Sequence, residues 1–213
     1  MVEGFRRINP RQDSRQPITP SMLAKIIGNL ARICSSPYEQ ALFRAAFSLG
    51  YFAFLRVGEF TANSKTDPGH ALHVHNIHLS ADKAITINMP SSKTDQRKHG
   101  TRLNIQPCAD KDICPGTAVA SFLQLFRPNV GGLLFVHADG SPLTRFQLAA
   151  VLKKSLKLSG FQAGRYSTHS LRIGACTTVS NRGASEHDIK SFGRWASHRF
   201  KSYIRIPSHL LSL

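Results

Sequence analysis

Long hydrophobic runs, paired cysteines and acidic residues are the features that this 213-residue sequence has least of. No apolar run reaches the roughly 18 residues that a membrane span requires, and the arginine-rich first residues lack the apolar core of a secretory signal. The four cysteines form no Cys-x-x-Cys pair, which argues against a zinc knuckle and against a disulfide framework. We therefore expect a soluble intracellular protein with reduced thiols and no membrane partner.

The shortage of acidic residues leaves a strong positive charge. Lysine and arginine number 28 against 12 acids, a formal net charge of +16 at pH 7. Between Arg145 and Arg205 the only acids are Glu186 and Asp188, whereas basic residues recur throughout. Such an excess is typical of proteins that bind the phosphate backbone of nucleic acids. A solvated basic face, or a surface of ribosomal type, is the alternative interpretation.

The chain length favours one domain preceded by a short arm. Residues 1–18 are polar, rich in arginine and interrupted by two prolines, which predicts a flexible arm or the remnant of a linker. The remaining residues, 19–213, suit a single hydrophobic core, since domains cluster at roughly 100–200 residues.

Two periodicities alternate along this domain. Apolar residues at helical spacing predict helices after Thr19-Pro20, over 41–55, after Cys114-Pro115, after Thr144, over 171–179 and from Ser185 to about Gly193. The stretch 41–55 is apolar nearly all round, which indicates a buried central helix or helix pair, broken near Gly50. Between residues 71 and 106 the period changes to two and predicts three short antiparallel strands at 72–79, 84–87 and 103–105. The pattern indicates an α+β fold.

Four histidines, His70, His73, His75 and His78, surround the first predicted strand. Two of them, His73 and His75, would share one face of that strand, a geometry that metal sites use. No cysteine or carboxylate is suitably spaced beside them, so we interpret this segment as a polar exposed edge without a metal site.

Four segments carry basic or aromatic residues suited to phosphate chemistry: 54–60, 90–95, 168–175 and 193–203. In this order they resemble the catalytic domain of the tyrosine recombinase, or phage-integrase-like, family over roughly residues 20–207. The motifs Ser-Lys-Thr-Asp-Gln and Gly-Arg-Trp-Ala-Ser look most like those of family members encoded by eukaryotic mobile elements of the DIRS and crypton kind. The resemblance implies a mostly helical α+β domain with a small antiparallel three-stranded sheet.

The resemblance also implies a reaction: DNA strand cleavage and rejoining through a 3′-phosphotyrosyl intermediate, as in site-specific recombination or integration of a mobile element. A tyrosine hydroxyl is a poor nucleophile at neutral pH, because its ordinary pKa is near ~10, so it needs cations around its target. Such chemistry uses neither metal nor nucleotide, and we expect no cofactor. The reaction implies double-stranded DNA as the partner. Relatives act as tetramers, which implies that this chain also self-associates on DNA.

Residue by residue, the resemblance assigns Tyr203 as the nucleophile. It assigns Arg56, His169 and Arg172 as contacts of the scissile phosphate, with His169 also assisting deprotonation of the tyrosine. Planar guanidiniums that grip two oxygens at once suit the negative charge of the transition state. Glu59 would position Arg56, although by spacing alone the two read as an ordinary salt bridge on one helical face.

Two further assignments have competitors. Lys93 would act as the general acid that protonates the departing 5′ oxygen, and Lys98 in the same polar loop is its rival. Trp195 would donate its indole N–H to the phosphate and pack behind the tyrosine. Most family members place the equivalent residue one position further from the tyrosine, which would select Arg194.

A non-catalytic DNA-binding module descended from a mobile element is the alternative function. A broken active site would mark it, and none of the six catalytic positions is broken here. Relatives carry an additional N-terminal helical domain that completes a clamp around DNA, so the chain is expected to be either a catalytic fragment or a reduced version. In a eukaryotic host we expect it in the nucleus.

Overall fold

The computed structural model describes residues 13–89, 100–125 and 132–205. The α-helices are α2 (Pro20–Gly28), α3 (Leu30–Ile33), α4 (Pro37–Phe52), α5 (Val57–Phe60), α6 (Pro115–Leu125), α7 (Arg145–Leu158), α8 (His169–Asn181) and α9 (Glu186–Gly193). The strands are β1 (Ile77–Leu79), β2 (Ile85–Met89) and β3 (Thr101–Ile105), and the 3-10 helices are η1 (Val74–Asn76), η2 (Ala163–Arg165) and η3 (His198–Tyr203). Helices precede and follow one small sheet, which confirms the predicted α+β class.

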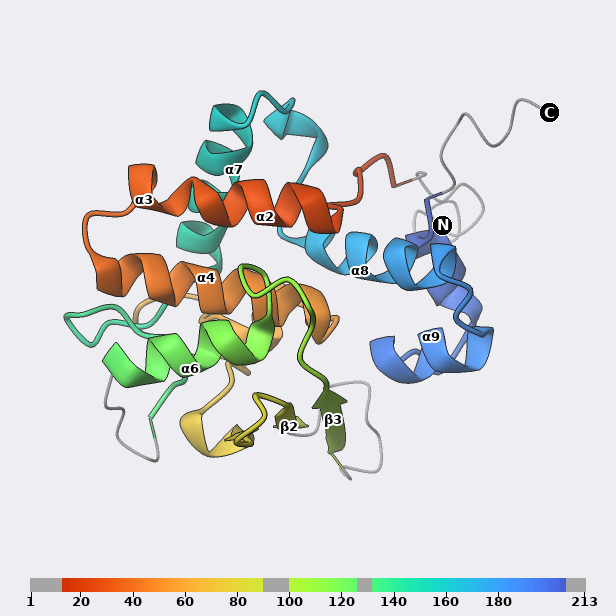
Figure 1. Ribbon diagram of the computed structural model, residues 1–213, viewed down its shortest axis with the longest axis horizontal. Coiled ribbons are helices and arrows are strands. Elements are labelled where there is room, and N and C mark those ends of the chain that lie inside the picture. The colour runs from red at the N-terminus through yellow and green to blue at the C-terminus, as the bar shows by residue number, and fades with distance from the viewer. Residues whose placement is uncertain (1–12, 90–99, 126–131, 206–213) are drawn as a thin grey trace, which may run out of the picture.

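The fold is organised around α4, which packs against α2, α3, α6 and α8 (Figure 1). Because α4 has neighbours on several sides, its apolar residues are buried nearly all round, as the sequence predicts. The predicted break near Gly50 is wrong, since α4 continues to Phe52. A Cβ atom at Gly50 would lie 2.9 Å from the ring of Phe60, so the glycine permits close packing against α5.

Side-chain caps begin several of the helices, and those at Thr19, Thr144 and Ser185 stand where the sequence predicts helix starts, whereas α4 begins earlier than the predicted 41–55. The hydroxyls of Thr19 and Ser36 accept backbone N–H bonds at the starts of α2 and α4, each of which has proline in its first turn. Thr144 begins α7 in the same way. At α9, Ser185 and Asp188 form a capping box in which each side chain bonds the backbone of the other.

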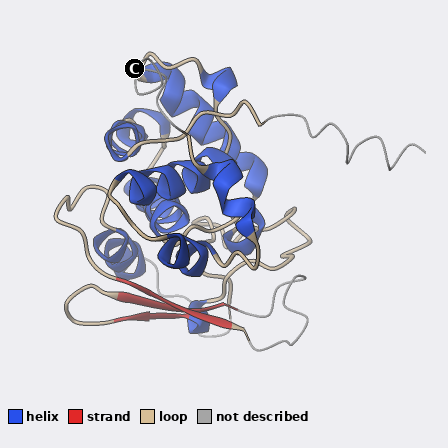
Figure 2. Ribbon diagram, turned by 90° about the vertical axis from the view of Figure 1, so that its right-hand side faces the viewer, coloured by secondary structure: helices blue, strands red, loops and turns tan. Residues whose placement is uncertain are grey.

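The sheet is antiparallel in the order β1-β2-β3. In β2, Ile85 and Ile87 are buried, whereas Thr86 and Asn88 lie on the other face, a two-residue period that follows from strand geometry. Figure 2 shows the main helices on one side of this sheet. The buried isoleucines therefore join the helical core.

The first strand is shorter than predicted. Only Ile77–Leu79 forms β1, because the preceding residues coil into η1. The side chain of Asn76 accepts a hydrogen bond from the backbone N–H of His73 at 2.8 Å and closes this turn. The Asn76 side chain thus holds these residues in a turn, although the alternating pattern predicts a strand there.

Residues 13–18 lie beside the C-terminal helices. The backbone N–H of Gln16 donates to the carbonyl of Arg165 at 2.9 Å, and that of Ile18 donates to Ser170 at 3.1 Å. Ile18 is 0% exposed. A Cβ at Gly174 would come within 1.8 Å of the Ile18 carbonyl oxygen, so α8 needs a glycine at this crossing.

We expect Gly174→Ala to lower the free energy of unfolding by roughly 1–3 kcal/mol, because the added methyl group overlaps a backbone oxygen that cannot move without shifting the chain. Urea denaturation of purified protein measures this. The matched control is Gly28→Ala at the end of α2, where no atom lies within 4 Å of the new Cβ. Equal stability of Gly174→Ala and the parent would contradict the described crossing.

Candidate active site

Arg56 and Arg194 share one carboxylate. Arg56 precedes α5, and its backbone N–H and guanidinium both donate to Glu59, at 2.7 and 3.1 Å. From the other side Arg194 donates to Glu59 at 2.6 Å. Glu59 is buried, so this carboxylate fixes the two cations relative to each other. The expected positioning contact to Arg56 is therefore present, and Arg194 joins it.

Arg172 is a buried cation without a carboxylate partner among the described ion pairs. Its side chain, on α8, donates to the backbone carbonyls of Phe54 and Gly193, while its Nε–H has no hydrogen-bond partner. Burial, together with the positive charges of Arg56 and Arg194, lowers the pKa of Arg172 to about 10. A buried guanidinium with a spare donor suits an anion such as a phosphate oxygen.

Aromatic rings cover this guanidinium. The Cζ atom of Arg172 lies 4.3 Å from the centroid of the Trp195 ring and 5.6 Å from that of Tyr203. Arg172 is 0% exposed as a result. An anion could therefore contact the guanidinium only after a group that covers it has moved.

His169 and Tyr203 face each other at 5.0 Å between ring centroids. His169 is the first residue of α8, and Tyr203 ends η3, where its carbonyl accepts a hydrogen bond from Thr177 at 3.2 Å. Burial lowers the pKa of His169 to about 4, and the charges of Arg15 and Arg172 contribute. A histidine that is neutral at pH 7 can accept a proton, which is what a base beside a tyrosine must do.

The adjacent residues Arg194 and Trp195 have different partners. Arg194 ends α9 in the left-handed conformation, with φ of 55°, and turns its side chain to Glu59. Trp195 instead packs 5.0 Å from Tyr203 and lies against Gly193, where a Cβ would come within 1.7 Å of the indole ring. Both rivals from the sequence thus contact the candidate site, one through charge and the other through its ring.

The structure therefore brings together Arg56, Glu59, His169, Arg172, Trp195 and Tyr203. Lys93 and its rival Lys98 lie outside the described residues. Thr101, at the start of β3, lines a recess of about 340 Å³ together with Arg194 and Trp195.

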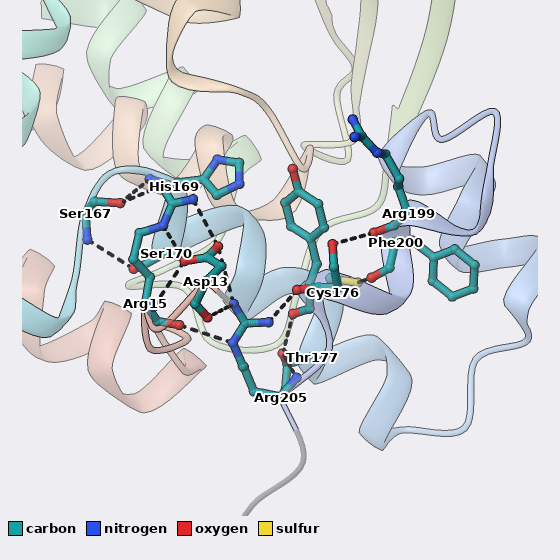
Figure 3. Close-up of polar contacts among 12 residues, drawn as sticks. Asp13, Arg15, Ser167, His169, Ser170, Cys176, Thr177, Arg199, Phe200 and Arg205 are labelled. Atoms are coloured by element: carbon teal, nitrogen blue, oxygen red, sulfur yellow. Dashed lines mark hydrogen bonds and ion pairs between the residues drawn. The ribbon is translucent and has the colours of Figure 1, made fainter. Parts of the chain in front are cut away.

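Sequence reasoning missed Arg15, which belongs to the expected arm. Its guanidinium reaches the hydroxyl of Ser167 at 3.5 Å, and that hydroxyl accepts the backbone N–H of His169 at 3.2 Å (Figure 3). No spacing signal marks this contact, because Arg15 and Ser167 are distant in sequence.

Two further observations concern the described ranges. The rings of His73 and His75 stack 5.4 Å apart, and no described cluster of three or more His, Cys, Asp or Glu could hold a metal ion. Likewise, none of the helices in these ranges is both long and apolar enough to span a bilayer.

No protein-family model matches the chain. In sequence it is similar to an integrase/recombinase XerD homolog from Selenomonas ruminantium, with 28% identity over 131 residues that cover 56% of this chain and 35% of that protein. The chain thus spans about a third of this curated relative.

Several solved structures share the fold. XerH site-specific recombinase bound to its palindromic difH substrate matches with a TM-score of 0.68 and 16% identity, over 92% of this chain and 50% of that one. XerA recombinase matches with a TM-score of 0.68 and 17% identity, over 95% and 63%. Tn1549 transposon integrase in complex with circular intermediate DNA matches with a TM-score of 0.58 and 13% identity, over 90% and 61%.

These likenesses establish that the chain has the fold of a tyrosine recombinase catalytic domain, as the sequence predicts. The sequence match and the fold together support a relationship with the tyrosine recombinase/integrase family, without singling out DIRS or crypton elements.

The lowered pKa of His169 predicts a pH dependence of stability. As the pH falls from 6.5 towards 4, an unfolded chain protonates this histidine while the folded chain keeps it neutral, so protonation favours unfolding. We expect the parent to lose unfolding free energy over this window relative to His169→Gln, as urea denaturation at pH 7 and pH 5 would measure. His187→Gln, a substitution at an exposed histidine, is measured alongside. Parallel curves for the parent and His169→Gln would contradict the burial of His169.

Proposed function

We propose that this domain cleaves and rejoins double-stranded DNA by the tyrosine recombinase reaction, with Tyr203 as nucleophile. The observation that carries the proposal is the convergence of Tyr203 and His169 beside Arg172, a buried cation that has a free donor and no carboxylate partner in the described structure. Groups of this kind are matched to a reaction that develops negative charge on phosphate oxygens.

The chemistry balances without an external reactant. The Tyr203 oxygen attacks the phosphorus and forms a phosphotyrosyl bond, while the bond from phosphorus to the 5′ oxygen breaks. His169 accepts the phenolic proton, and a general acid gives a proton to the departing 5′ oxygen. Attack of a 5′ hydroxyl on the phosphotyrosyl bond then rejoins a strand and releases the tyrosine.

Arg56 and Arg172 would hold the non-bridging oxygens of the phosphate. Glu59 would set the orientation of Arg56, and Arg194 would steady Glu59 from its other side. Trp195 would donate its indole N–H and pack beside the nucleophile, a role that its 5.0 Å distance to the Tyr203 ring supports. We assign Trp195, and not Arg194, to the phosphate, because of the two it is Trp195 whose ring packs against Tyr203, whereas Arg194 turns to Glu59.

We assign Lys93 as the general acid, with Lys98 as the alternative. Thr101, at the start of β3, lies in the recess beside Trp195, which supports a role for the loop between β2 and β3. The Ser-Lys-Thr-Asp wording around Lys93 favours it over Lys98.

The partner that we propose is double-stranded DNA, which the net charge of +16 supports. XerH bound to difH, Tn1549 integrase with circular intermediate DNA and a lambda integrase dimer bound to a core site are DNA complexes with this fold. We further propose self-association on DNA, an origin in a mobile element of DIRS or crypton kind, and a nuclear location in a eukaryotic host. Residues 19–213 would form the catalytic domain.

The test of the nucleophile is a covalent-trapping assay with a nicked suicide duplex. The parent should form a protein–DNA adduct, and Tyr203→Phe should bind the same DNA without forming one, because it lacks the attacking oxygen. Tyr166→Phe is the matched control, since Tyr166 is also half-buried but packs against Phe161, and its adduct yield should equal the parent's.

An adduct of parental yield in Tyr203→Phe would overturn the assignment. A parent that binds DNA tightly and yet never forms an adduct would instead establish the non-catalytic DNA-binding module.

Sulfur substitution distinguishes the two lysines. A general acid contributes about a hundredfold or more when the leaving group is an alkoxide, and little when it is a thiolate. Lys93→Ala should therefore cleave ordinary DNA slowly and recover most of its rate when sulfur replaces the bridging 5′ oxygen, whereas Lys98→Ala should match the parent on both substrates. Rescue of Lys98→Ala in place of Lys93→Ala would show that the acid is Lys98.

A further inference from the structure

Arg205, which lies just beyond η3, contacts the N-terminal segment. Arg205, two positions after Tyr203, donates from its side chain to the carbonyl of Arg15 at 3.2 Å and to that of Asp13 at 3.0 Å (Figure 3). It also pairs with the Asp13 carboxylate at 3.4 Å. Its backbone N–H donates to Thr177 at 3.1 Å, and the Thr177 hydroxyl donates to the carbonyl of Tyr203. The backbone that carries the tyrosine is thus held from two sides, by α8 and by Asp13–Arg15.

The same segment reaches the histidine. Asp13 accepts two side-chain hydrogen bonds from Arg15, at 2.8 and 3.0 Å, which fix the direction of that guanidinium. Arg15 in turn contacts Ser167, whose hydroxyl accepts the backbone N–H of His169. A continuous path of contacts therefore runs from Arg205, through Asp13 and Arg15, to the start of α8.

The charges on this path also act on the site. The hydrogen bond from Arg15 lowers the pKa of Asp13 to about 2, so the carboxylate is ionised at neutral pH. Arg15 interacts electrostatically with both His169 and Tyr203. Exposed ion pairs contribute little to stability, and the side chains of Arg15 and Asp13 are 41% and 32% exposed, so we expect little stabilisation from this pair.

We propose that Asp13 and Arg15 are positioning residues that set the placement of Tyr203 relative to His169, so that the segment upstream of α2 controls strand cleavage. This inference rests on the proposed function, because it requires Tyr203 to be the nucleophile. These contacts would link the reacting tyrosine to residues 13–15, which precede α2.

The first experiment measures the single-turnover rate of adduct formation at saturating DNA, together with the dissociation constant. Asp13→Asn keeps an oxygen for the backbone N–H of Arg15 but loses the charge, and Asp13→Ala loses both. We expect about a tenfold to hundredfold slower cleavage, the loss caused by small misplacement of reacting groups. The dissociation constant should stay equal or fall, because each variant removes a negative charge.

The matched control is Asp139→Asn, which removes the same charge from an exposed turn held by Ser141. It should cleave at the parental rate. A parental rate in both Asp13 variants would overturn the positioning role while leaving Tyr203 as the nucleophile. Weaker DNA binding with an unchanged saturated rate would also overturn it, because it would make the segment a DNA contact.

The second experiment does not depend on cleavage. The titration of His169, followed by proton NMR in the free protein, should move to higher pH in Arg15→Gln, because one of the cations that disfavour its protonation is gone. Arg199→Gln is the control, since Arg199 is exposed and should leave the titration unchanged. If the parent forms no adduct, the proposed function fails, and an unmoved His169 titration in Arg15→Gln would then overturn the contact as well.

Discussion

The candidate site depends on one constraint, the burial of the positive charge of Arg172. A guanidinium removed from water must keep its N–H groups hydrogen-bonded, or its burial costs several kcal/mol. Two carbonyls accept hydrogen bonds from its terminal nitrogens and leave the Nε–H without a partner. Both carbonyls lie at helix ends, that of Phe54 just after α4 and that of Gly193 at the last residue of α9. Phe54 and Arg194 have φ angles of 52° and 55°, conformations that other residues than glycine seldom adopt. The turns that accept this strain are the turns that solvate the charge.

Among the described residues of the candidate site, the cations outnumber the carboxylates. Glu59 is one carboxylate shared by two arginines, and Arg172 adds a third cation that has no carboxylate partner of its own within residues 13–89, 100–125 and 132–205. The lowered pKa of Arg172 and that of Arg194 are signs of mutual repulsion and burial. In the proposed reaction, a dianionic transition state would relieve this repulsion.

The parts of the molecule that the sequence predicts are local, and the parts that it does not predict are contacts between distant segments. Caps at Thr19 and Ser185 and the helical periods depend on near neighbours, and the structure has them where expected. The predicted helix break at Gly50 is wrong because the glycine makes room for Phe60, a contact that the low helix propensity of glycine does not reveal. The link from Asp13 to Arg205 joins nearly opposite ends of the chain, and no periodicity records it. The meeting of the motif residues could be expected only from the family resemblance.

The rings over Arg172 have a consequence for selectivity. An anion that binds this guanidinium must first move a group that covers it, such as Trp195 or Tyr203, and give up its packing. A free phosphate or sulfate ion makes too few contacts to offset that loss, whereas a duplex that touches many basic side chains can supply it. If DNA is the substrate, as we propose, the cover over Arg172 would disfavour small anions relative to a duplex.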